Sequence, residues 1–299
     1  MKKVSIITRT KDRGIFLKRA LETISKQDYT NYEWVIVNDG GEKTPVDQVV
    51  KMAIEKKISV KVVHNDESLG MEAASNVGIR QATGEYIAIH DDDDTWEACF
   101  LSKCVSFLEQ NTHYKGVISY IFRVHEKVID NDIVISKKYP QKKGLGHISL
   151  PSIAHPSRNF PPISFLYHKS VFSDIGLYNE DLPVLGDWDF HLRFLRKYDI
   201  GLVPEPIANY HIRNDLYNSI YSNTVVSGTD THNKYYNIIL NKLIREDLDS
   251  GKIGLGFLLS QCNEFQKLNH NTFLLLYANN LIKKVITKIS FIKRKLFLF

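Results

Sequence analysis

The chain has 299 residues, of which 43% are hydrophobic and 24% are charged. This composition is typical of a globular protein and excludes a disordered or fibrous chain. The net charge of +5 comes from the end of the sequence, where seven lysines and arginines follow Glu264, the last acidic residue. The rest of the chain is therefore slightly acidic, and a general nucleic-acid coat is excluded.

The N-terminal half alternates short β-rich runs with helical patterns. Strands are predicted at residues 3–8, 33–37, 59–64 and 85–90, and helices at 15–25, 46–55 and 72–82. This order predicts an α/β fold with a mostly parallel sheet that helices cover on both faces. Further on, the sequence predicts longer, antiparallel strands at 117–135, a mobile proline-rich loop at 140–162 and helices from residue 229.

The cysteines and the apolar runs bear on the compartment. Cys99, Cys104 and Cys262 are an odd number and form no CxxC pair, which favours a reducing environment over a disulfide framework. The apolar run after Lys3 is too short for a signal peptide, and no run is long enough to span a membrane. We therefore expect a cytoplasmic protein.

Polar residues follow each of the four predicted strands. They are Thr8-Arg9, Asn38-Asp39, Asn65-Asp66 and Asp91 to Asp94. In parallel sheets the carboxyl ends of the strands meet at one edge, and ligands bind there. The sequence therefore predicts a binding site at this edge.

The acidic run after His90 is the strongest signal for chemistry. In an extended backbone Asp91 and Asp93 project to one side, and Asp92 and Asp94 to the other. Neighbouring carboxylates repel by roughly 2–3 kcal/mol at an effective dielectric near 20, and a divalent cation offsets this repulsion. The run predicts Mn²⁺ or Mg²⁺ beside a nucleotide diphosphate, with a solvated acidic turn as the alternative.

An ordered set of segments resembles the family 2 glycosyltransferases. The segments are VSIITRTKDR (4–13), YEWVIVNDG (32–40), GMEAASNVGIRQATGEYIAIHDDDD (70–94), GLYNE (176–180), GDWDFHLRFL (186–195) and YHIRNDLYNS (210–219). The resemblance implies a GT-A glycosyltransferase domain over residues 1–220 and a helical extension over 221–299. It also implies metal-dependent, inverting transfer of one sugar from a nucleotide-sugar donor, expected to be a UDP-sugar. The acceptor would be a glycan or a lipid-linked hydroxyl in surface polysaccharide or lipopolysaccharide synthesis.

The resemblance also implies roles at the donor end of the site. Donor-binding roles fall on Thr8, Arg9, Asp39, Asn76, Asp91 and Arg213. Asp91 and Asp93 match the DxD motif, with Asp91 near the ribose and diphosphate and Asp93 a metal ligand, while His211 either completes the metal shell or is structural. Asp39 matches the aspartate that accepts a hydrogen bond from the base. Arg9 and Arg13 either bind phosphate or pair with nearby acids.

Asp187 is the candidate catalytic base. The resemblance places an aspartate here, often after a glutamate, but this chain has Gly186 before it and Asp189 two residues later. Asp189 therefore stays open as the base. Asp187 could also cap a helix, which stabilises a helix by about 1 kcal/mol.

The C-terminal residues 281–299 carry apolar residues at helical spacing, with lysines off that stripe. This pattern predicts a basic amphipathic helix that binds an anionic membrane surface peripherally, with a packing helix as the alternative.

Two other functions compete with a glycosyltransferase. One is a nucleotide-sugar or glycan-binding module without catalysis. The other is a nucleotidyltransferase, which should carry a glycine-rich turn after the first strand, and residues 8–13 are not one.

Overall fold

The computed structural model describes residues 1–130, 132–141, 148–213, 221–223, 229–256, 259 and 261. By internal contacts the chain divides into two compact units, residues 1–237 and 238–299. The domain boundary at residue 220 stays a prediction. The predicted membrane-binding helix at 281–299 lies outside the described residues.

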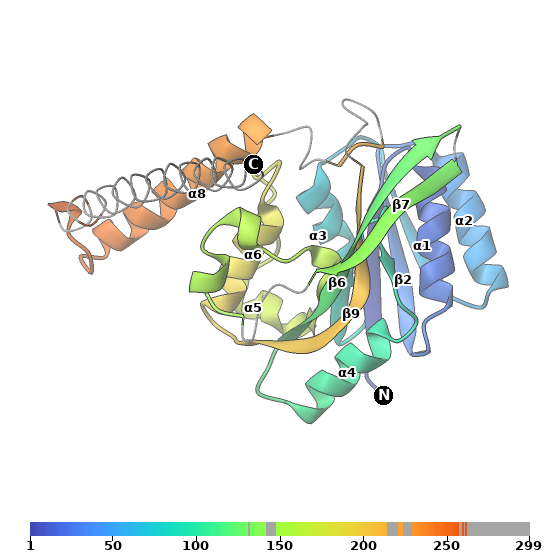
Figure 1. The fold of residues 1–299 in the computed structure, drawn as a ribbon, viewed down its shortest axis with the longest axis horizontal. Helices are drawn as coiled ribbons and strands as arrows, with labels where there is room; N and C mark the ends of the chain where they lie inside the picture. The colour runs from blue at the N-terminus through green and yellow to red at the C-terminus, as the bar shows by residue number, and fades with distance from the viewer. Residues whose placement is uncertain are drawn as a thin grey trace, which may run out of the picture. The chain divides into compact units, whose positions relative to one another are not determined.

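Strands and helices alternate along the N-terminal half (Figure 1). They are β1 (Val4–Thr10), α1 (Gly14–Ser25), β2 (Tyr32–Asp39), α2 (Lys43–Glu55), β3 (Ser59–Asn65), α3 (Met71–Gln81) and β4 (Tyr86–Ile89). The elements that the sequence predicts in this half are therefore confirmed, with ends that differ by a few residues.

The second part of the chain completes the sheet. Its elements are β5 (Thr95–Trp96), α4 (Phe100–Gln110), β6 (Gly116–Ile129), β7 (Asp132–Gln141), β8 (Phe165–His168), α5 (Phe172–Ile175), α6 (Gly186–Leu195), β9 (Ile200–Ile212) and α8 (Thr229–Asp249). The described strands form one sheet in the order β3-β2-β1-β4-β8-β6-β9-β5, with β7 paired to β6.

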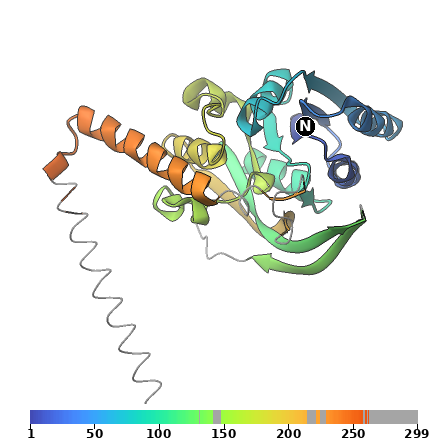
Figure 2. The same cartoon turned by 90° about the horizontal axis from the view of Figure 1, so that it is seen from above.

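The first four strands of this order are parallel to one another, whereas β8 is antiparallel to both β4 and β6. The predicted antiparallel pair is confirmed as β6 and β7, which form a long curved ribbon (Figure 2).

Alternating side chains along each parallel strand form two cores. Ile6 of β1 packs in one cluster with Leu17 of α1, whereas its neighbour Ile7 packs in the other cluster with Ile79 of α3 and Phe190 of α6. Successive side chains of a strand point to opposite faces, so a continuous apolar run requires helices on both faces. The prediction of helices on both faces is confirmed, with α1 and α2 on one side and α3 on the other (Figure 1).

The predicted loop at 140–162 has defined local structure in the part that the structure describes. Short 3₁₀ turns form at Pro151–Ile153, Pro156–Arg158 and Pro162–Ser164, and the side chains of Ile153 and Phe160 are buried in the second core. Prolines fix these turns and the apolar residues between them anchor the segment. Among the described residues, no helix is long and apolar enough to cross a membrane.

Candidate active site

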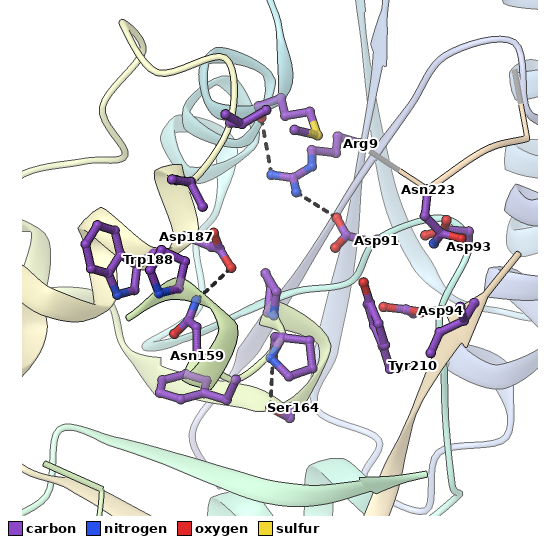
Figure 3. Close-up of a pocket in the computed structure, with 18 of the residues that line it drawn as sticks. Arg9, Asp91, Asp93, Asp94, Asn159, Ser164, Asp187, Trp188, Tyr210 and Asn223 are labelled. Carbon is purple, nitrogen blue, oxygen red and sulfur yellow. Dashed lines mark hydrogen bonds and ion pairs between the residues drawn. The ribbon is translucent and has the colours of Figure 1, made fainter. Parts of the chain in front are cut away.

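A cavity of about 950 Å³ opens at the carboxyl ends of β1 and β2. The structure brings five of the predicted site residues together around it: Arg9, Asp39, Asp91, Asp93 and Asp187. The acidic residues that follow β4 lie on one side of the cavity, and Asp187 lies on the other (Figure 3). These residues therefore lie at the sheet edge that the sequence indicates.

The acidic run is a turn and not an extended segment. The Asp94 N–H donates to the Asp91 carbonyl at 3.1 Å, so Asp94 turns back to line the cavity beside Asp91 and Asp93. Asp92 is fully buried, where it accepts the Thr10 hydroxyl at 2.7 Å. The expected alternation is thus correct for Asp92 and wrong for Asp94.

Arginines hold the carboxylates that line the cavity. Arg9 Nη2 lies 2.9 Å from Asp91 Oδ1, and its Nη1 donates to the Ser75 hydroxyl at 2.5 Å. Arg13 Nη2 lies 2.6 Å from Asp92 Oδ1, and its Nη1 lies 3.5 Å from Asp93 Oδ2. Both arginines also line the cavity, so they can pair with these acids and still face a phosphate.

Arg213, a predicted donor-binding residue, does not line the cavity in this structure. Its side chain is buried behind the acidic turn, where it contacts Asp93, pairs with Glu126 at 2.6 Å and donates to the Tyr221 carbonyl at 2.7 Å. Each nitrogen of this guanidinium has an acceptor in the protein. Arg213 therefore positions Asp93 from behind.

The sequence leaves His211 open between a metal ligand and a structural residue, and both of its ring nitrogens have protein partners. Its Nδ1 lies 2.5 Å from Glu126 Oε2, and its Nε2 lies 2.9 Å from the Thr95 hydroxyl, which itself accepts Asn209 Nδ2 at 3.0 Å. Burial lowers the pKa of His211, so the ring is neutral, Nδ1 donates to Glu126 and Nε2 accepts from Thr95. No lone pair of the ring is left for a metal.

Thr8 and Asn76 are two further predicted donor-binding residues whose side chains contact the protein. Thr8 is fully buried in β1, and its hydroxyl accepts the Trp34 indole N–H at 2.8 Å. Asn76 accepts the backbone N–H of Tyr178 at 3.0 Å and donates to its carbonyl at 2.9 Å. Neither side chain lines the cavity in this structure.

Asp39 lines the cavity, but its carboxylate already has four donors. Asn65, Ser68 and the backbone N–H groups of Leu69 and Gly70 all donate to it within 3.1 Å. Burial raises the pKa of Asp39, but these hydrogen bonds outweigh burial and hold the pKa below its usual value. In this structure Asp39 organises the loop before α3, and a nucleotide base would have to displace one donor.

Gly40 allows this close approach of two loops. It has a φ of +72°, and a Cβ on it would lie 2.4 Å from the Ser68 backbone nitrogen. Only glycine adopts this conformation without strain and leaves room for the neighbouring loop.

Asp187 lies in the first turn of α6 and faces the cavity (Figure 3). Asn159 Nδ2 donates to Asp187 Oδ2 at 2.9 Å, and Asn159 Oδ1 lies 2.8 Å from His191 Nδ1, so the amide is held at both ends. Burial raises the pKa of Asp187. Asp189 instead pairs with Arg193 at 2.8 Å and does not line the cavity, which favours Asp187 over Asp189 as a base.

The charges around the acidic turn leave a surplus of carboxylates. Glu72, Asp91, Asp92, Asp93, Asp94, Glu126 and Asp187 gather with the guanidinium groups of Arg9, Arg13, Arg19 and Arg213. Burial, together with the nearby carboxylates, raises the pKa of Asp92 to about 6 and that of Asp94 well above its usual value.

A divalent cation fits this charge and the oxygen donors of Asp91 and Asp93. The predicted trio with His211 is not assembled, because in the described part of the chain no three His, Cys, Asp or Glu side chains are grouped to hold a metal.

Three residues of the site escape sequence reasoning. Glu126 of β6 joins Arg213 and Arg19, Asn159 holds Asp187, and Glu72 of α3 lines the cavity. Each lies far along the chain from its partners. The only sequence signal among them is a glutamate in the first turn of a predicted helix, which is an ordinary place for one.

Comparison with known proteins agrees with this geometry. The sequence profile described as Glycosyl transferase family 2 matches residues 5–176. The uncharacterized glycosyltransferase YwdF of Bacillus subtilis is 28% identical over 203 residues, 68% of this chain and 71% of the relative. The Escherichia coli relative WfgD, named a UDP-Glc:α-D-GlcNAc-diphosphoundecaprenol β-1,3-glucosyltransferase, is 27% identical over 139 residues, 46% of this chain and 52% of WfgD.

Two solved structures share the fold. S. aureus TarS in complex with UDP-GlcNAc has a TM-score of 0.58 at 20% identity, over 72% of this chain and 60% of that chain. The mannosyltransferase PcManGT of Pyrobaculum calidifontis, in complex with GDP-Man and Mn²⁺, has a TM-score of 0.54 at 18% identity, over 70% of this chain and 56% of that chain. These likenesses confirm the predicted GT-A fold, and the matched profile covers more than half of the sequence. The chain belongs to the family 2 glycosyltransferases.

Proposed function

We propose that the protein transfers a single sugar from a UDP-sugar to a hydroxyl of a glycan or lipid-linked acceptor, with inversion at the anomeric carbon, in surface polysaccharide synthesis. One observation carries this proposal: Arg9 and Asp91 at the strand ends share one cavity of about 950 Å³ with the carboxylate of Asp187. A cavity of this size accommodates a nucleotide sugar together with part of an acceptor.

The donor diphosphate would lie against the arginines at the end of β1. Arg9 is fixed by Ser75 and by the Met71 carbonyl, and Arg13 is fixed by Asp92, so both guanidinium groups are held before a ligand arrives. Charge-assisted hydrogen bonds from arginine to phosphate are roughly twice as strong as neutral ones. A Mn²⁺ or Mg²⁺ ion held by Asp91 and Asp93 would neutralise charge on the departing diphosphate.

Asp187 would act as the base. It takes the proton of the acceptor hydroxyl while that oxygen forms a bond to the anomeric carbon. The bond from this carbon to the diphosphate breaks, and its electron pair leaves with the diphosphate. Asn159 keeps the carboxylate aimed at the cavity, and the raised pKa of Asp187 makes it a stronger base than a free aspartate.

The acceptor class is supported by the relatives. WfgD is named for a UDP-linked donor and a diphosphoundecaprenol acceptor, and the Mycobacterium bovis relative is named a PGL/p-HBAD biosynthesis glycosyltransferase. A lipid-linked acceptor would also give the basic segment at 281–299 a purpose, because that segment would hold the enzyme at an anionic membrane surface.

A panel of UDP- and GDP-sugars, assayed for nucleotide release with and without Mn²⁺, tests this function. We expect release from at least one UDP-sugar and a loss of roughly 10²–10⁴-fold in kcat for Asp187→Asn, with nucleotide affinity retained. Asp189→Asn is the matched control, since it removes a carboxylate outside the cavity and should retain most activity.

Two results would contradict the proposal. If no donor were turned over and Asp93→Ala left nucleotide affinity unchanged, the cavity would not be a donor site. If a nucleotide sugar bound tightly without turnover, a binding module without catalysis would be favoured.

A further inference from the structure

Glu72 is a buried carboxylate in the cavity that the proposed reaction leaves without a role. It lies in the first turn of α3 and is 4% exposed. Its Oε2 has no hydrogen-bond partner in the described part of the chain, and the nearest guanidinium nitrogen, Arg9 Nη1, lies 3.9 Å away, beyond hydrogen-bond range. A buried carboxylate oxygen without a hydrogen-bond donor costs free energy, and its place in the cavity lining points to a ligand that supplies one.

The position of this carboxylate depends on a glycine in another helix. A Cβ on Gly186 would lie 2.3 Å from Glu72 Cδ and 2.5 Å from Oε1. The carboxylate of α3 therefore rests directly on the backbone at the start of α6, one residue before Asp187. Any side chain at residue 186 would push it away.

Glu72 lies between the donor side and the acceptor side of the cavity. Arg9, which also pairs with Asp91, flanks Glu72 on the donor side, and Gly186, which contacts Glu72, precedes Asp187 on the acceptor side. The group that lies between a bound diphosphate and the base is the sugar in transit. Sugar hydroxyls are the donors that such a carboxylate lacks.

We propose that Glu72 binds a ring hydroxyl of the transferred sugar and so selects donors that carry this hydroxyl. The proposal rests on the proposed function, because it requires a nucleotide-sugar donor in this cavity. Burial, with Asp187 and Asp91 adding to it against the opposing effect of Arg9, raises the pKa of Glu72 to about 7. A carboxyl that is partly protonated near neutral pH both accepts from and donates to a hydroxyl, which suits a sugar.

The test uses the donor that the wild-type enzyme turns over and the analogues that each lack one ring hydroxyl. For wild type, kcat/KM should fall about 10- to 100-fold for one analogue, because a hydrogen bond to a charged group is lost. The kcat/KM of Glu72→Ala for the parent donor should be lower than that of wild type by a similar factor. It should not fall further for that analogue. Glu72→Gln should retain part of the preference, because an amide still accepts from and donates to a hydroxyl.

Gly186→Ala supplies a second test that leaves the chemistry of Glu72 intact. Its methyl group displaces the carboxylate, so this variant should show the same loss of preference for the same analogue. The double variant Glu72→Ala with Gly186→Ala should have the same kcat/KM as Glu72→Ala alone, because the new methyl group no longer meets the Glu72 carboxylate.

The outcomes separate the two proposals. If Glu72→Ala lowers kcat/KM by one factor for the parent and all analogues, Glu72 only supports packing and this inference is wrong, while the proposed function stands. If wild type turns over no donor at all, the proposed function fails and the inference fails with it.

Discussion

The buried carboxylate of Glu126 should be a large single contributor to stability near the site. Its side chain is fully buried and joins three cationic or hydrogen-bonding groups: Arg19 at 2.6 Å, Arg213 at 2.6 Å and His211 at 2.5 Å. Glu126→Gln keeps the size of the side chain but turns an NH₂ group toward one of these donors. The variant therefore leaves a guanidinium group facing another donor in the protein interior.

Two arguments give the loss in the free energy of unfolding that we expect for Glu126→Gln. Breaking a buried ion pair by removing one partner costs about 3–5 kcal/mol. Burial alone would raise the pKa of Glu126, but the hydrogen bonds from His211 and Arg19 outweigh burial and lower the pKa to about 2. Relative to an ordinary glutamate near 4.3, this shift corresponds to about 3 kcal/mol at neutral pH. A loss of about 3 kcal/mol in a protein of this size lowers Tm by on the order of 10 °C.

The pH dependence has a definite sign. The folded state has the lower pKa, so the contribution of Glu126 is fully present above the unfolded pKa and is lost as the pH falls toward about 2. Urea unfolding of wild type and Glu126→Gln should therefore differ most at pH 7 and progressively less below about pH 4.

Glu205→Gln is the matched control. It removes an exposed partner of Lys103, and it should cost less than about 1 kcal/mol at every pH. A difference between wild type and Glu126→Gln that is no larger than this control, or that does not change with pH, would refute the reasoning.

Three further predictions test the roles of His211, Asn76 and Asp187. His211→Asn should lower the free energy of unfolding by about 1–3 kcal/mol, because Glu126 loses a buried donor. It should leave the Mn²⁺ dependence of activity unchanged. A rise in the Mn²⁺ concentration that gives half-maximal activity would favour metal ligation by His211. Asn76→Ala should lower the free energy of unfolding by about 2 kcal/mol in urea titrations, because Asn76 holds both backbone groups of Tyr178. A rise in the KM for the donor without this loss of stability would contradict the place of Asn76 outside the cavity. Burial raises the pKa of Asp187, and only the ionised carboxylate accepts a proton. The value of kcat/KM should therefore rise with pH around a midpoint above ~3.9, the pKa of a free aspartate. A midpoint at or below that value would argue against Asp187 as the base.

The part of the fold made of local patterns could be predicted from the sequence. The strands and helices from β1 to β4 follow from apolar runs and helical spacing, and their order implies a parallel sheet with a site at its edge. The antiparallel strands β6 and β7 could also be predicted from their β-rich pattern. The pairing of β6 with β9, which begins some 80 residues after the start of β6, depends on contacts that one sequence does not display.

The expected place of Thr8 depends on where the first strand ends. The predicted first strand ends at Thr8, but β1 continues to Thr10, which pairs with Asn38. Thr8 is therefore buried two residues inside the strand, where its hydroxyl accepts the Trp34 indole N–H, whereas Thr10 at the strand end lines the cavity. Two residues at a strand end decide whether a side chain contacts a ligand or the core.

The acidic turn shows what a single sequence cannot assign. Four consecutive aspartates look alike in one dimension, yet their partners differ: Arg9 for Asp91, Thr10 and Arg13 for Asp92, Arg213 for Asp93, and the His211 N–H for Asp94. These partners come from β1, the turn before α1 and the end of β9, and only the folded sheet brings them to one place. Since Arg9 and Arg13 also face the cavity, a bound diphosphate would compete with the aspartates for the same guanidinium groups. Donor binding would then free Asp91 and part of Asp93, which are the carboxylates proposed to hold a cation, so that donor and metal would each favour the binding of the other.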